Sequence, residues 1–179
     1  MRSNKLFWFL IIGYWLFIHP VQIYASYMLP YPSTMPGNKI YTFTRIVDNL
    51  KAYWYVGDIA QVKYHLMLSD KYLVEAKTLF EYKQYLLAQD ALVRSDMHFK
   101  LLSNALSNGK KHGKDMGEIG HAVADAAVAH ITLLNSLQTI LPESFEWKPE
   151  KGDTTNIPVY EHISEAKQIR MSVKQMLQR

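Results

Sequence analysis

Three residues of this chain are spaced for metal chemistry: Glu118, His121 and Asp125. Steps of three and four residues place their side chains on one face of a helix. Di-iron helical bundles use a Glu-x-x-His pair on each of two helices, together with further glutamates. This chain has one such pair, and His162-x-x-Glu165 has the reverse order. We therefore interpret the three residues as a polar helix face, and keep a metal-binding bundle or metalloenzyme as the alternative.

Nucleophilic and cofactor chemistry have no recognisable motif in the sequence. No Gly-x-Ser-x-Gly occurs, and Ser69, Ser95 and Ser136 lie within apolar helical stretches. Residues 108–117 are rich in Gly and Lys but lack the Gly-Lys-Ser/Thr of a phosphate loop, so we expect a mobile, solvated basic loop. His130 lies among apolar residues, where a hydrogen-bonded core histidine is the ordinary explanation. We assign no catalytic residue and no cofactor.

The composition is that of a folded domain without disulfides. The 179 residues are 49% hydrophobic and include no cysteine, which excludes thiolate metal sites, a cysteine nucleophile and a lipoprotein anchor. The formal net charge is +4, and removal of residues 1–25 leaves 18 basic and 16 acidic residues. This small excess argues against nucleic acid as a partner.

Residues 1–25 have the pattern of a secretory signal peptide. Arg2 and Lys5 precede an apolar run of 13 residues, 6–18. Pro20 prevents the run from continuing further. A membrane-spanning helix needs about 20 apolar residues. We therefore predict that the export machinery removes this segment and releases an extracytoplasmic or periplasmic protein, with an uncleaved N-terminal membrane anchor as the alternative.

A proline-rich segment follows at residues 26–38. Pro30 and Pro32, on either side of Tyr31, fix their own φ angles and favour extended geometry in the residues before them. We expect an extended strap that packs on the helices. The alternative is a ligand for an aromatic groove on a partner.

Helical periodicity is clearest from Asp58, which we expect to be the N-cap, to Glu81. The residues of its inner face recur in steps of three and four: Ile59, Val62, Leu66, Ser69, Leu73, Ala76 and Phe80. Further helices are predicted at 38–55, 84–107 and 116–141, and from Asn156-Ile157-Pro158 nearly to the end, with a polar loop at 143–155. The fold class is therefore all-α: a bundle of four to five helices forming a single domain, 39–179.

The first predicted helix has an apolar stripe that we expect to face the bundle: Ile40, Phe43, Val47, Leu50 and Trp54. The aromatic cluster Tyr53-Trp54-Tyr55 is expected to pack into the turn before the central helix. The alternative for this cluster is a surface that binds a partner.

The strap and the central helix carry a resemblance to a known family. The matching residues are Tyr27-x-Leu29-Pro30-Tyr31-Pro32, Arg45, Asp58 and Leu66-x-Leu68-Ser69-Asp70-Lys71-Tyr72-Leu73-x-Glu75-Ala76. They resemble the pattern of a bacterial domain of unknown function found in exported or membrane-anchored proteins. The resemblance spans about residues 27–92, so residues 39–107 hold the family-like helices and 116–179 the additional ones. It implies an extracytoplasmic helical protein and no established activity.

One ion pair is suggested by the same segment. Asp70 borders the apolar face of the central helix, and Arg45 lies on the first helix. If the two helices are antiparallel, these side chains can pair across the interface and fix its register. A solvated Asp70 is the alternative.

These observations favour a non-enzymatic binding or structural component of the cell envelope. We expect it to present a helical groove or the strap to another envelope protein or a surface polymer. The oligomeric state stays open.

Overall fold

The helix α3 (Asp58–Glu81) forms with the bounds that the sequence predicts. Gly57, at φ 99°, takes the N-cap position expected for Asp58, which begins the helix. The computed structural model describes residues 27–178. The predicted signal peptide and Ser26 lie outside the described residues.

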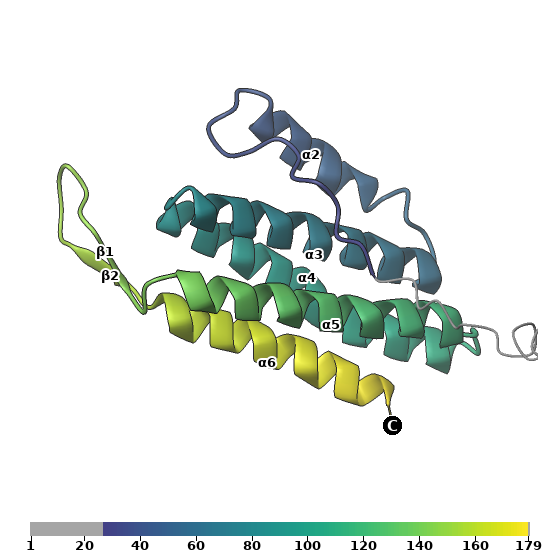
Figure 1. Ribbon diagram of the computed structural model, residues 1–179. Helices are drawn as coiled ribbons and strands as arrows, with labels where there is room; N and C mark the ends of the chain where they lie inside the picture. The colour runs from purple at the N-terminus through teal and green to yellow at the C-terminus, as the bar shows by residue number, and fades with distance from the viewer. Residues whose placement is uncertain (1–26, 179) are drawn as a thin grey trace, which may run out of the picture.

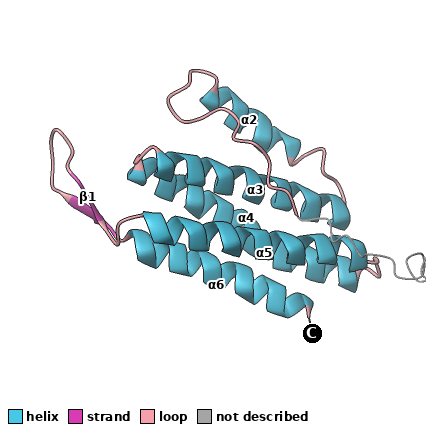
Figure 2. Ribbon diagram, in the orientation of Figure 1, coloured by secondary structure: helices cyan, strands magenta, loops and turns pink. Residues whose placement is uncertain are grey.

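Four further helices and one small hairpin complete the described part of the chain (Figures 1 and 2). Their bounds are α2 (Tyr41–Lys51), α4 (Tyr85–Lys111), α5 (Gly117–Ile140), α6 (Val159–Leu177), β1 (Phe145–Trp147) and β2 (Thr155–Ile157). The all-α class is thus confirmed. Residues 27–40 contain no helix or strand. None of the described helices is both long and apolar enough to cross a membrane.

Helices α3 to α6 alternate in direction and form a four-helix bundle (Figure 1). Around the bundle α3 packs on α4, α4 on α6, α6 on α5, and α5 on α3. Helix α2 runs along α3, on the side away from α6. The last two helices therefore share one bundle with α3 and α4.

The core consists of two hydrophobic clusters placed one after the other along the bundle axis. The cluster nearer the hairpin includes Leu73, Phe80, Leu92, Leu134 and Ile163, and the other includes Leu66, Phe99, Leu102, Ala127 and Val173. On each helix a polar position falls between the two clusters: Asp70 on α3, Asp96 on α4, His130 on α5 and Arg170 on α6. We call these four residues the central polar layer.

Three local expectations were wrong. Residues 108–111 continue α4 instead of forming a loop, and Gly109 is buried there against the Met116 side chain. The expected polar loop at 143–155 contains strand β1 and the start of β2, paired antiparallel in a hairpin. Asn156 lies in β2, so Pro158 occupies the N-cap position of α6.

Candidate functional site

The residues proposed as metal ligands lie along the exposed surface of α5. Glu118, His121 and Asp125 are all exposed. Among residues 27–178, no group of three or more His, Cys, Asp or Glu side chains is arranged to hold a metal ion. The structure therefore gives the metal-binding alternative no support.

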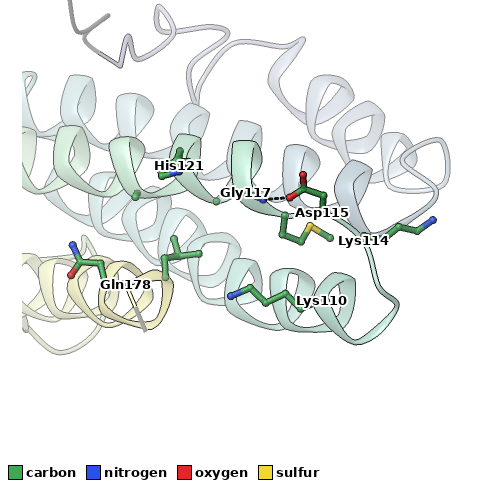
Figure 3. Close-up of a pocket in the computed structure, with 10 residues that line it drawn as sticks. Lys110, Lys114, Asp115, Gly117, His121 and Gln178 are labelled. Atoms are coloured by element: carbon green, nitrogen blue, oxygen red, sulfur yellow. Dashed lines mark hydrogen bonds between the residues drawn. The ribbon is translucent and has the colours of Figure 1, made fainter. Parts of the chain in front are cut away.

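His121 lines a pocket of about 590 Å³ at the end of the bundle (Figure 3). Lys110 and Lys114 give this pocket a basic lining, and the amino end of α5 borders it. The backbone N–H of Gly117 donates to Asp115 Oδ1 at 2.8 Å. Because this carboxylate already occupies the helix terminus, the pocket offers no ready anion site there.

The central polar layer joins all four helices of the bundle. His130 is fully buried, as the sequence predicts for a core histidine, and its Nε2 lies 2.7 Å from Asp70 Oδ1. Arg170 Nε donates to His130 Nδ1 at 3.4 Å. With Nδ1 accepting, Nε2 carries the proton and donates to Asp70. Burial lowers the pKa of His130, which agrees with this neutral form.

Arg170 needs the most hydrogen-bond and charge partners of the four residues, because its guanidinium group is fully buried. It forms an ion pair with Asp96, donates to Ser95 Oγ at 2.7 Å and donates to the Ala166 carbonyl at 3.0 Å. The guanidinium carbon of Arg170 also lies over the ring of Phe99, 5.1 Å from the ring centroid. Burial lowers the pKa of Arg170 and raises that of Asp96, and each charge opposes the shift of the other.

This arrangement is unsuited to catalysis. A His–Asp hydrogen bond is one half of a nucleophile-activating set, but the hydroxyl groups nearby are already engaged. Ser95 Oγ donates to the Ser69 carbonyl at 2.8 Å, and Ser69 Oγ donates to the Ser95 carbonyl at 3.0 Å. Both serines are fully buried. The layer therefore serves to set the register of the helices.

Asp70 has partners other than the one suggested by the sequence. Its Oδ2 accepts from the hydroxyl of Tyr27 at 2.5 Å, so the strap is tied directly to the central polar layer. Burial, followed by the negative charge of Asp70, raises the pKa of Tyr27. No ion pair joins Asp70 to Arg45 in the described structure, and the positive charge of Arg45 acts instead on Tyr72 and Glu75. The predicted pairing is not formed.

The face of α2 that contacts α3 is polar. Asp48, the buried residue of this helix, forms ion pairs with Lys51 (3.1 Å) and Lys71. Tyr41 donates from its hydroxyl to Glu75 Oε1 at 2.5 Å. Burial raises the pKa of Tyr41 to about 12 and also raises that of Glu75. Helix α2 is thus held mainly through charged and hydrogen-bonding groups.

The opposite face of α2 is apolar and exposed, which contradicts the expected packing of the stripe. Phe43 is 65% exposed, Ile46 53% and Leu50 48%. In the turn that follows, Tyr53 and Trp54 are also exposed, and only Tyr55 of the aromatic cluster packs, with its ring centroid 5.4 Å from that of Tyr64. We call Phe43, Ile46, Leu50, Tyr53 and Trp54 the outer face of α2. Sequence periodicity placed Phe43, Leu50 and Trp54 on one face but did not show which way that face turns, and Val47, predicted for the same stripe, is half-buried.

The strap has exposed side chains in addition to those of the outer face of α2. Tyr31 is 96% exposed, and Pro30 and Pro32 on either side of it are exposed as well. Of the strap residues, it is Tyr27 that reaches the core. The central prolines are therefore free of the close packing that the sequence favoured for this segment.

A pair of histidines between α3 and α4 was not singled out from the sequence. His65 Nδ1 and His98 Nδ1 lie 3.1 Å apart, and Tyr72 stacks on His98 with ring centroids 5.8 Å apart. One ring must donate to the other, which requires that they do not both carry a charge. Burial, followed by the charge of His65, lowers the pKa of His98 to about 4.

The fold and these contacts define an α-helical bundle with a buried polar layer and an amphipathic helix whose apolar face is exposed. Comparison of the chain with protein-family models, with curated proteins and with solved structures gives no match.

We expect Arg170 and Asp96 to be strongly coupled. Arg170→Met leaves a carboxylate without its buried charge partner and should lower the free energy of unfolding by about 3–5 kcal/mol. Adding Asp96→Leu removes that carboxylate and should recover part of the loss. Urea denaturation of the four proteins in this cycle measures the coupling.

The matched control is the i,i+4 ion pair of Lys77 and Glu81, which lies on the exposed surface of α3. The cycle built from Lys77→Met and Glu81→Leu should give a coupling of about 0.3–0.5 kcal/mol. Equal coupling energies in the two cycles would contradict the role assigned to the central polar layer.

Stability should fall on acidification in a way that depends on His98. Between about pH 6.5 and 4 the unfolded chain binds a proton at this residue and the folded protein does not, so the free energy of unfolding falls as the pH falls. The raised pKa values of Glu75 and Asp96 make the free energy of unfolding rise as the pH falls. The test is therefore a comparison of the variant with wild type. His98→Phe should make the fall shallower, as measured by urea denaturation at pH 7, 6 and 5. The control is His121→Phe, on the exposed surface of α5, and an identical slope in wild type and His98→Phe would show that the prediction is wrong.

Proposed function

We propose that the protein is an exported, non-enzymatic binding domain of the bacterial cell envelope, and that the outer face of α2 is its recognition surface. One observation carries the proposal: α2 turns its polar face to the bundle and its apolar face outward. Contiguous exposed apolar side chains are unusual on a monomeric protein and commonly mark interaction sites.

The orientation of α2 follows from its polar contacts. Rotating the helix to bury Phe43 and Leu50 would separate Asp48 from Lys71 and leave Glu75 without the Tyr41 hydroxyl. Leaving buried charged groups without partners costs more than the exposed apolar side chains would gain by burial. The apolar residues therefore stay available for a partner.

Two further features support a binding role over an enzymatic one. In the central polar layer, His130 and Arg170 are fully buried and hydrogen-bonded to other side chains of the bundle. The exposed Tyr31 and its flanking prolines extend the set of side chains that a partner can contact. Export is supported by the signal-peptide pattern of residues 1–25 and by the family resemblance of residues 27–92.

The proposal is tested by photocrosslinking in the cells that export the protein. A photoreactive amino acid replaces Ile46 on the outer face of α2, and in a second strain it replaces Ile140, which is 66% exposed on α5. We expect a crosslinked envelope component with the first strain and none with the second. Equal capture at both positions, or none at either with the protein free in the soluble envelope fraction, would contradict a recognition surface on α2.

A further inference from the structure

The outer face of α2 continues beyond the helix as one exposed surface. Phe43, Ile46 and Leu50 follow the helix axis at steps of three and four residues. Two exposed aromatic residues, Tyr53 and Trp54, come next in the turn before α3. A helix with Phe and Leu on one face and Trp and Tyr at its end has the side chains that favour the boundary between lipid and water.

The accessible charge around this surface is positive. Residues 39–56 contain Lys39, Arg45 and Lys51, and their one acidic residue is Asp48. That carboxylate is 2% exposed and is neutralised by Lys51 and Lys71. Within this segment an anionic surface approaching α2 therefore meets the exposed Lys39, then Lys51 with its charge paired to Asp48, and no exposed carboxylate. Such a distribution is attracted to anionic lipid headgroups.

The polar groups of α2 do not oppose contact with lipid. Two of its polar side chains turn towards α3, where the Tyr41 hydroxyl donates to Glu75 and Asp48 pairs with Lys71. The polar residues left on the outward side are the uncharged Thr42 and Asn49. The helix can thus enter the interface without losing the contacts that hold it to the bundle.

The sequence before the described residues points to the same partner. An apolar run at 6–18, preceded by Arg2 and Lys5, has the composition of a segment that enters a membrane. The described chain begins at Tyr27, which is fixed to Asp70 on α3, and α2 follows within the next 14 residues. Where residues 1–25 are kept as the N-terminal anchor, this short connection holds α2 close to the bilayer.

We propose that the partner of the outer face of α2 is the surface of an anionic lipid bilayer, in which the helix lies parallel to the membrane plane. The inference rests on the function proposed above and names the partner of the same surface. A bilayer needs no shape complementarity, so the narrow face of one helix is enough, whereas a stable protein interface buries about 800 Å² on each partner. A protein partner, including a second copy of this chain, is the competing outcome.

The test uses the full chain, which has no cysteine, with a single Ile46→Cys substitution carrying an environment-sensitive fluorophore. The labelled protein is mixed with phosphatidylcholine vesicles with or without about a third phosphatidylglycerol. We expect a blue shift and quenching by lipid-borne quenchers, stronger with the anionic vesicles. The same label at Ile140→Cys is the control, and it should report water in both cases.

Two variants separate the apolar from the electrostatic contribution. Phe43→Ser with Leu50→Ser should abolish the lipid signal at position 46, and circular dichroism checks that the helices remain. Lys39→Gln should weaken binding to anionic vesicles about fivefold and leave binding to neutral vesicles unchanged. Identical signals at positions 46 and 140, or no preference for anionic lipid, would overturn the membrane inference.

The two proposals can fail separately. If position 46 crosslinks to an envelope protein in cells and its label stays in water on both kinds of vesicle, the membrane inference is wrong and the binding domain stands. If neither experiment gives a signal at position 46, both proposals are wrong.

Discussion

The buried guanidinium group of Arg170 is the constraint on which the bundle depends. A charge removed from water must be met by an opposite charge and by acceptors for its remaining donors. Asp96, Ser95 and the Ala166 carbonyl meet that need, and the contact with His130 carries the network on to Asp70. Each of the four helices contributes one member. Sliding any one of them along the axis would leave a buried charge unpaired, so this layer fixes a register that the two hydrophobic clusters alone would leave less specific.

The need of buried charged groups for partners also explains the unusual orientation of α2. Glu75 and Lys71 lie on the side of α3 that faces α2, and both need partners. Tyr41 and Asp48 supply them, so the polar side of α2 becomes its inner side. The apolar residues are then outside as a consequence. The attachment of α2 to the bundle and the exposure of its apolar residues have one physical origin, the polar contacts between α2 and α3.

The sequence predicted the elements better than their contacts. The bounds of α3 and the burial of His130 follow from local pattern, because Gly57 ends the preceding segment and apolar residues surround the histidine. The partners of Asp70 and Arg170 could not be predicted, since they lie on helices far apart in the chain. The short strands β1 and β2 carry no alternating pattern, and the stripe of α2 does not reveal which face turns inward. Glu118, His121 and Asp125, the ligands of the metal-binding alternative, share an exposed face of α5, and helical spacing alone does not bring further ligands from other helices.

The orientation of α2 can be measured directly through thiol reactivity. Ile46→Cys and Leu50→Cys probe the outer face of the helix, and Ala52→Cys, at its C-cap, probes the side that packs against the cluster of Tyr64, Leu68 and Tyr72. The account predicts that a maleimide reacts with the first two in the folded protein nearly as fast as in urea, and at least about tenfold more slowly with the third, because local opening must precede its reaction. Fast reaction at position 52 with protection at positions 46 and 50 would show that α2 buries its apolar face, and would contradict the account.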